Sequence, residues 1–494
     1  MVVEHTIGFW YSSRMRQVPV GPAPHRGPEP EADAARRSAV RAWCLYDWAN
    51  SAFATSVIAA ILPPFFAAVA GRELPGHLAT AARGNARPAA LLVAAVTGPV
   101  LGAAADHLGR KKPLLFACVA VGAAATALLG LVPWGGWHAL LVLFAIAFVA
   151  FAAGNVLYDA LLPGVAAPGE MDRVSSRGFA YGYVGGGLLL AVNLAWILKP
   201  RAFGLADADA ATRLSFVSVA LWWLLFSIPL FRRVPEAPGA RDAGPRADTG
   251  DAGAPADAGD AGLRAEAGGA GGAAAPAGAE HAGPPASLPA AVARRLARTI
   301  AGVRRQPELF RFLIAFWLYS DGIGTIIKMA AIYGAEIGIG RADLIGALLL
   351  VQILAAPASL AFGRIAGRLG ARPAILAGLA GYLGITLFAF FLTRPWHFWA
   401  LAALVAMFQG GTQALSRSLF ATLVPRARVG ELFGFYSVSE KLAGVVGPLL
   451  FGLVAQASGA GRLGVLTLLP FFLGGGWLLA TVDLERGARR AREG

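Results

Sequence analysis

The stretch Trp43–Phe66, WCLYDWANSAFATSVIAAILPPFF, is long and apolar enough to cross a bilayer, for which about 20 such residues are needed. Its first two turns nevertheless contain Asp47, Asn50 and Ser51. A carboxylate near the centre of a membrane helix costs roughly 2.5–3.5 kcal/mol and normally faces a bundle interior or a water-filled path. Because the three residues are spaced i, i+3 and i+4, they share one helix face. The stretch predicts a membrane helix whose polar stripe serves either a structural network between helices or a functional site.

The composition of the whole chain points the same way. Of its 494 residues 56% are hydrophobic and only 15% are charged, with a mean hydropathy of +0.59, which indicates a polytopic membrane protein. The net charge of +14 comes from basic residues in short loops between apolar segments, without a nucleic-acid-binding pattern. We therefore expect the lipid bilayer and a small-molecule solute as partners, and neither nucleic acid nor an obligate protein partner.

The residues that usually hold metals and cofactors are scarce in the apolar segments. Cys44 and Cys118 have no metal or disulfide spacing, and all seven histidines lie in tails, loops or span ends. The phosphate-binding pattern G-x-x-x-x-G-K-[ST] does not occur. We expect no metal, no cofactor, no direct use of ATP and no enzymatic activity.

Hydropathy predicts an all-α fold with twelve membrane spans in two halves of six. The expected spans are 42–70, 89–105, 113–132, 137–163, 178–198, 214–231, 310–335, 344–363, 373–393, 395–424, 431–457 and 463–482. The expected domains are a disordered tail (1–41), an N-terminal half (42–231), a disordered linker (232–287), a basic amphipathic interfacial helix (288–305), a C-terminal half (306–484) and a tail (485–494). We expect no signal peptide in the first tail.

The distribution of basic residues predicts the orientation in the membrane. Most Lys and Arg residues fall in the tails and in the loops that join even to odd spans. By the positive-inside rule, both termini are cytoplasmic, and the expected location is the inner membrane of a bacterium.

A glycine-bounded loop joins the second and third spans. It reads GAAADHLGRKK from Gly102 to Lys112 and places Asp106, Gly109, Arg110 and Lys111 at the predicted cytoplasmic surface. A tight turn, an acid that can accept bonds from a helix N-terminus and a basic cluster suit a gate. The loop matches the signature G-x-x-x-D-x-x-G-R-[KR] of the major facilitator superfamily. A related GRIAGRLG at Gly363–Gly370 lacks the acid, and its position suggests an internal duplication into two parallel halves.

Four stretches narrow the resemblance. YDWANSAF (Tyr46–Phe53), DGIGTIIKMAAIYG (Asp321–Gly334), GGTQALSRSLFATLVP (Gly410–Pro425) and ELFGFYSVSEKLAGVVGP (Glu431–Pro448) resemble the vacuole-effluxer branch of that superfamily. The resemblance implies twelve helices, alternating access and secondary transport, with export of neutral amino acids in fungal members. It also implies that the first, fourth, seventh and tenth helices line the cavity.

Twelve polar residues within the spans are candidates for substrate binding or coupling. They are Asp47, Asn50, Asn155, Tyr158, Asp159, Asp321, Lys328, Gln409, Gln413, Arg417, Glu440 and Lys441. Arg417 or Lys328 suits an amino-acid carboxylate, and Asp47 or Asp321 suits the ammonium group. An equal alternative is that Arg417 pairs with an acid and locks a closed state. Coupling to protons needs a carboxylate that titrates near neutral pH, for which Asp47, Asp159, Asp321 and Glu440 are candidates, with Asp47 and Asp321 preferred.

The sequence therefore predicts a secondary active transporter of small polar solutes, amino acids first, with protons as the candidate coupling ion. An exporter of drugs, peptides or lipid-like solutes is the alternative within transporters. A non-transporting scaffold or sensor, with the tail, linker and basic helix holding a cytoplasmic partner, is the alternative of another class.

Overall fold

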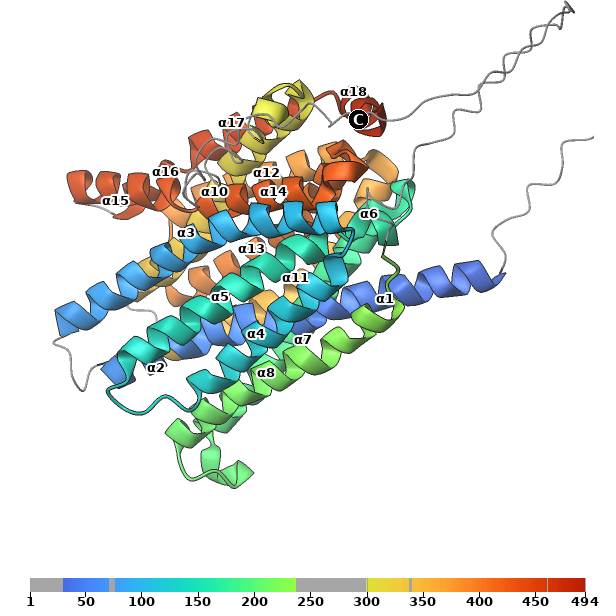
Figure 1. The fold of residues 1–494 in the computed structure, drawn as a ribbon. Coiled ribbons are helices and arrows are strands. Elements are labelled where there is room, and N and C mark those ends of the chain that lie inside the picture. The colour runs from blue at the N-terminus through green and yellow to red at the C-terminus, as the bar shows by residue number, and fades with distance from the viewer. Residues whose placement is uncertain are drawn as a thin grey trace, which may run out of the picture.

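The computed structural model describes residues 30–70, 76–236, 299, 301–336, 340–459 and 461–493, and it is a helical bundle throughout these residues (Figure 1). The first half of the chain, from blue to green, and the second half, from yellow to red, each form a group of long helices. The start of α1, the short helix α6 and the C-terminal helix α18 lie at one end of the bundle, which we call the termini end. The opposite end carries the α1–α3 and α15–α16 connections.

The N-terminal half contains eight α-helices and three shorter or wider helical segments. These are α1 (Pro30–Ala52), η1 (Phe53–Ile61), α2 (Leu62–Ala70), α3 (Gly76–Leu108), α4 (Lys111–Leu129), α5 (Trp137–Asp159), α6 (Leu162–Val165), η2 (Pro168–Glu170), α7 (Met171–Leu198), η3 (Pro200–Phe203) and α8 (Ala208–Arg233). The C-terminal half contains α10 (Pro307–Glu336), α11 (Arg341–Leu369), α12 (Ala371–Phe390), α13 (Pro395–Leu423), η4 (Arg426–Arg428), α14 (Val429–Leu442), α15 (Val446–Ser458), α16 (Gly461–Leu466), α17 (Leu469–Ala480) and α18 (Leu484–Glu493).

The predicted spans agree with these helices. Among the described residues, eleven helical segments are long and apolar enough to cross a membrane. The remaining expected span, 89–105, falls within α3, whose described apolar part is Val93–Leu108. The prediction of an all-α membrane protein with twelve spans in two six-helix halves is confirmed.

The expected disordered tail over 1–41 is wrong for its last residues, because α1 already begins at Pro30. Proline fits the first turn of a helix, and Glu31 and Asp33 in that turn complement the helix dipole, so these polar residues favour a helix start. The described part of the expected C-terminal tail, 485–493, is helical and belongs to α18. The predicted linker lies almost entirely outside the described residues, as does the predicted interfacial helix, of which only Thr299 and 301–305 are described.

Two spans are irregular along their length. The first span changes from α-helix to π-helix at Phe53 and returns to α-helix at Leu62, directly before Pro63 and Pro64. The eleventh span breaks between α14 and α15, where Gly444 has a φ of 88°. Residues with a Cβ atom are disfavoured in that left-handed conformation, so glycine is required at the break.

The apolar side chains are distributed as in a membrane protein. Large aromatic residues such as Trp43, Tyr158 and Trp223 are fully buried. Many equally apolar side chains are exposed on the outer surface, among them Leu225 at 61% and Trp477 at 68%. A soluble protein rarely exposes so much apolar surface, whereas lipid contact accounts for it.

The two halves meet along two lines of contact. In one, α7 packs against α11 and α13; in the other, α3 packs against α14. Along the second line, the backbones of α3 and α14 approach each other closely at Gly102, where an added Cβ would lie 2.0 Å from the carbonyl oxygen of Gly430. The hydrogen bonds that the structure gives between the halves lie in the part of the bundle toward the termini end.

Candidate functional site

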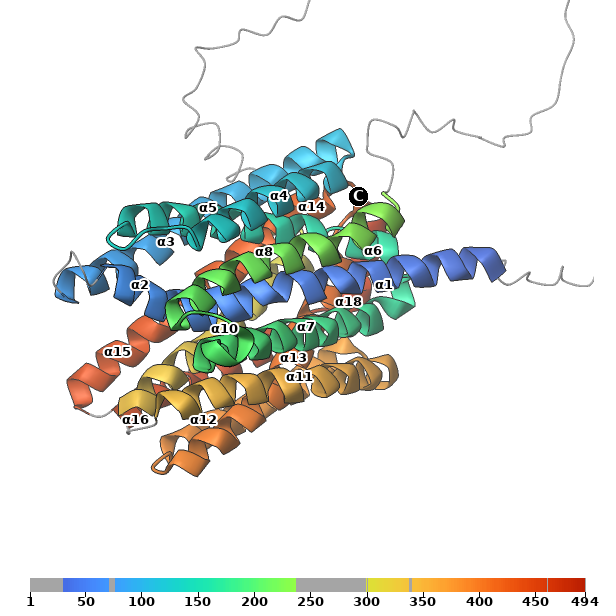
Figure 2. The same ribbon diagram turned by 90° about the horizontal axis from the view of Figure 1, so that it is seen from below.

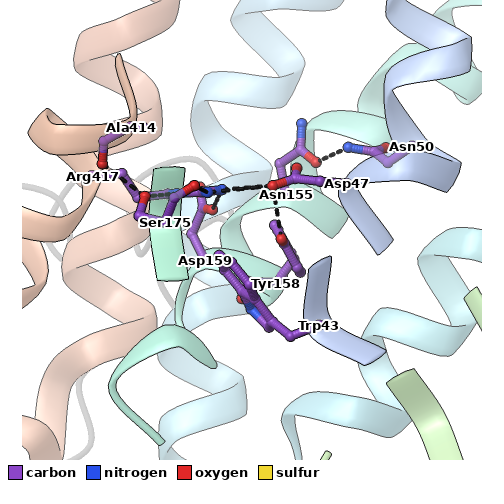
Figure 3. Close-up of polar contacts among 9 residues, drawn as sticks. All are labelled: Trp43, Asp47, Asn50, Asn155, Tyr158, Asp159, Ser175, Ala414 and Arg417. Carbon is purple, nitrogen blue, oxygen red and sulfur yellow. Dashed lines mark hydrogen bonds and ion pairs between the residues drawn. The ribbon is translucent and has the colours of Figure 1, made fainter. Parts of the chain in front are cut away.

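Arg417 of α13 is the centre of a polar network between the two halves (Figure 3). Its guanidinium lies 3.3 Å from Asp47 Oδ2 of α1 and 3.0 Å from Asp159 Oδ1 of α5. Arg417 is only 4% exposed, while the Asp47 and Asp159 side chains are 14% and 19% exposed. Two carboxylates thus share one buried guanidinium, with limited access of solvent to the acids.

Hydrogen bonds from α5 fix the first carboxylate of this network. The Tyr158 hydroxyl donates to Asp47 Oδ2 at 2.8 Å, and the Asn50 amide donates to Asn155 Oδ1 at 2.5 Å one turn away. The i, i+3, i+4 spacing in each helix places these side chains on facing stripes. Five N-terminal-half residues that the sequence singled out therefore lie together, as Figure 3 shows.

Aromatic rings enclose the guanidinium. The Arg417 Cζ atom lies 4.8 Å from the ring centroid of Trp43 and 4.5 Å from that of Phe179. Trp43 also stacks on Tyr158 with centroids 4.5 Å apart and donates from Nε1 to the Tyr158 carbonyl oxygen. Cation–π contacts in a desolvated site are worth up to about 2 kcal/mol, so the rings hold the charge between the halves.

Helix α7 supplies contacts that the sequence reasoning missed. Arg417 Nε donates to Ser175 Oγ at 2.9 Å and its Nη2 donates to the Ser175 carbonyl oxygen at 3.0 Å, while Ser175 Oγ donates to the Ala414 carbonyl oxygen. A Cβ on Gly178 would lie 2.5 Å from Asp47 Oδ2, so only glycine fits beside this pair. The signal in the sequence is SSRGF at 175–179, in the second and third turns of α7, where three of the five residues are small. The expected span begins at 178, after the polar residues Asp172, Arg173 and Arg177, whereas α7 begins at Met171.

The predicted gate loop joins the halves at the termini end. Asp106 Oδ2 accepts a hydrogen bond from the backbone N–H of Glu431 at 2.9 Å, in the first turn of α14. Its Oδ1 lies 3.2 Å from Lys111 Nζ. The N-terminus of a helix attracts a carboxylate, as the sequence argument required, and here that helix belongs to the other half. Gly109, with a φ of 64°, forms the turn, and the neighbouring Arg110 is exposed.

Asp321 lies in a separate cluster and does not contact Arg417. Its Oδ1 accepts from the backbone N–H groups of Gly444 and Gly447, at the break between α14 and α15. Lys328 Nζ donates to the Gly444 carbonyl oxygen at 2.8 Å. Asp321 is fully buried, and among the residues that the structure describes its Oδ2 atom has no hydrogen-bond partner. These two candidates therefore hold the broken helix in place.

The remaining candidates differ in their surroundings. Gln413 and Gln409 are half-buried on α13, one and two turns before Arg417 respectively, and within the described part of the chain neither side chain makes a hydrogen bond. Lys441 Nζ donates to Ser437 Oγ, one turn before it on α14, and Glu440 is exposed. Among the residues that the structure describes, no group of three or more His, Cys, Asp or Glu could hold a metal ion.

Relatives in sequence match most of the chain. A family model described as "Vacuole effluxer Atg22 like" matches residues 87–492. An uncharacterized MFS-type transporter YxiO of Bacillus subtilis is 34% identical over 445 residues, which cover 90% of this chain and 94% of the relative. The autophagy-related protein 22-1 of Aspergillus niger is 25% identical, and the match covers 65% of this chain and 48% of the fungal protein.

Solved structures give the same fold. The MFS proton:xylose symporter XylE has a TM-score of 0.64 at 13% identity, over 91% of this chain and 96% of its own. The human organic anion transporter MFSD10 has a TM-score of 0.62 at 16% identity, over 90% of this chain and 99% of its own. At these identities the likeness is one of fold, and it is the major facilitator fold. The family model and the bacterial relative show the family: the chain is an integral membrane protein of the major facilitator superfamily and belongs to the Atg22-like vacuole effluxer family.

Proposed function

We propose that this transporter moves small polar solutes with an amino group, amino acids first, and that protons couple at the Asp47–Asp159 pair. The observation that carries the proposal is the unequal charge of the network: two carboxylates face one guanidinium at the junction of the halves. A buried, unbalanced carboxylate is costly, so a proton or a substrate ammonium group is favoured there. The word "effluxer" in the family description supports export as the direction.

The geometry supports the lock role of Arg417 over the clamp role. Its donors are already directed at Asp47, Asp159 and Ser175, which leaves few for a substrate carboxylate. The half-buried amides of Gln409 and Gln413 lie on the same helix and are free to bind a solute. In this scheme a cation or proton at the carboxylates weakens their hold on Arg417, and the halves separate at the termini end.

The test uses the purified chain in proteoliposomes. Labelled amino acids are measured in two assays: uptake driven by an imposed pH gradient, and exchange between equal concentrations without a gradient. We expect the wild type to perform both. Asp159→Asn should keep exchange but lose the response to the gradient by about tenfold or more, because an amide cannot take up and release the proton.

Asp209→Asn is the matched control, since it also neutralises an aspartate paired with an arginine, Arg213, but far from the network. It should behave as the wild type. Gradient-driven uptake by Asp159→Asn at the wild-type rate would overturn the coupling assignment. Exchange of no amino acid by the wild type would overturn the substrate class.

A further inference from the structure

Six arginines form a cluster on the outer surface at the termini end, separate from the Arg417 network. Three neighbouring helices, α1, α7 and α11, each present two of them one turn apart, with α7 in the middle (Figure 2). We call this cluster the arginine basin; its members are Arg37, Arg41, Arg173, Arg177, Arg364 and Arg368. All six side chains are exposed.

Two cavities open beside α7 within the basin. One, of about 380 Å³, lies between α7 and α11 and is lined also by Ser176 and Leu360. The other, of about 560 Å³, lies between α1 and α7 and is lined also by Val40. Arg173 and Arg177 line both, so they are the shared wall of the two cavities.

The basin lacks balancing negative charge. Within the described residues none of its six arginines forms an ion pair, and the one acid among the residues lining the cavities, Glu170, is bound by Arg36 at 2.7 Å. Like charges one helical turn apart repel each other. Arginines gathered in cavities whose one acid is already paired favour an anion with several oxygen atoms, which guanidinium groups bind in a bidentate manner.

An apolar stripe continues from the basin along α7. Tyr181, Val184 and Leu188 follow Arg177 at i+4, i+7 and i+11, so they lie on the same helix face, and their exposed fractions are 38%, 47% and 49%. Tyrosine is common at the depth where headgroups meet hydrocarbon. A charged patch followed by an exposed apolar stripe matches a molecule with an anionic head and a long apolar tail.

We propose that the arginine basin binds the phosphate of an anionic phospholipid, with an acyl chain along the stripe on α7. Basic pockets between membrane helices are suited to such headgroups. A soluble phosphate would use the same arginines but would leave the stripe without a role. The site is distinct from the transport network and is tested by binding alone.

The test measures lipid binding to the full-length protein in detergent by native mass spectrometry. The probes are dioleoyl phosphatidylglycerol, dioleoyl phosphatidylcholine and glycerol 3-phosphate, the last carrying the phosphate without acyl chains. We expect the wild type to bind phosphatidylglycerol at least about tenfold more tightly than either other probe. Arg173→Gln with Arg177→Gln should lose that preference, whereas Arg173→Lys with Arg177→Lys should keep only part of it, because the charge remains and the bidentate geometry does not.

Arg232→Gln with Arg233→Gln is the matched control, because it removes two exposed charges from the same end of the bundle on α8. It should bind like the wild type. Equal binding of phosphatidylglycerol and phosphatidylcholine by the wild type would overturn the proposal. So would an unchanged preference for phosphatidylglycerol in the variant Arg173→Gln with Arg177→Gln. Equal binding of glycerol 3-phosphate would replace the lipid with a soluble phosphate. A preference found only after deletion of 236–287 would instead assign the basin to the carboxylates of that acidic segment.

Discussion

At the scale of single residues, Arg417 on α13 joins the second half of the chain to Asp47 on α1 and Asp159 on α5. Its type and its position in an apolar span predict either a substrate carboxylate or a partner acid as its ligand, and Asp47 and Asp159 both fill the second role. The sequence could not place Ser175, because serine is common in membrane helices and its backbone carbonyl, which also binds Arg417, leaves no trace in the residue type. It could not separate Asp321 from this network either, because the helix break that binds Asp321 arises from tertiary packing.

The charges of the network predict how variants change stability. Arg417→Ala leaves Asp47 and Asp159 buried without their cation, and removing one partner of a buried pair typically costs about 3–5 kcal/mol. We expect that loss in the free energy of unfolding, measured by denaturant titration with tryptophan fluorescence. Adding Asp47→Asn and Asp159→Asn to Arg417→Ala should recover a large part of it, since no unpaired charge then remains. A single Arg417→Ala variant as stable as the wild type would show that the network does not hold the halves together.

At the scale of elements, the long apolar helices were predictable, and their irregular points were not. The sequence LAGVVGP at 442–448 contains the glycine and proline that accompany the break between α14 and α15, yet membrane helices tolerate both residues without breaking. The π-helical segment from Phe53 has no residue signature that distinguishes it from α-helix. The early start of α1 was missed because polar residues before a span resemble a tail as much as a first turn.

The contact between α3 and α14 predicts the effect of one added methyl group. In Gly102→Ala the new Cβ would lie 2.0 Å from the backbone oxygen of Gly430, which cannot rotate away, so the helices must separate. Overpacking of this kind costs about 1–3 kcal/mol, and we expect a lower thermal midpoint for the purified protein.

Gly384→Ala is the control, because it lies inside α12 with nothing within 4 Å of the added Cβ. Glycine to alanine there should be neutral or stabilising by up to about 1 kcal/mol. Equal midpoints for the two variants would mean that α3 and α14 are not this close in the molecule.

At the scale of the whole molecule, hydropathy was enough to predict the fold, whereas only some of the residues that join the halves could be predicted from the sequence. Twelve spans in two groups could be counted from the sequence because bilayer thickness fixes the length of each span. The conformation could not be predicted, since hydropathy gives the number and length of the spans but not how the two halves are arranged against each other. The structure has its inter-half hydrogen bonds at the termini end, through Asp106, Ser175, Arg417 and Ser418.

A reversible crosslink at that end tests whether transport requires its opening. Ser418 Oγ on α13 donates to Asp172 Oδ1 on α7 at 2.5 Å, so cysteines at these positions would face each other across the junction, and the gel mobility of the oxidised protein shows whether a disulfide has formed. In a background with Cys44 and Cys118 replaced by serine, we expect Asp172→Cys with Ser418→Cys to lose transport on oxidation and regain it on reduction. Each single cysteine variant is the control for the substitution itself and should be insensitive to oxidant. Unchanged transport by a fully crosslinked protein would mean that the halves do not separate here. Solute would then have to pass by a route that leaves α7 and α13 together, and Arg417 could not be the lock.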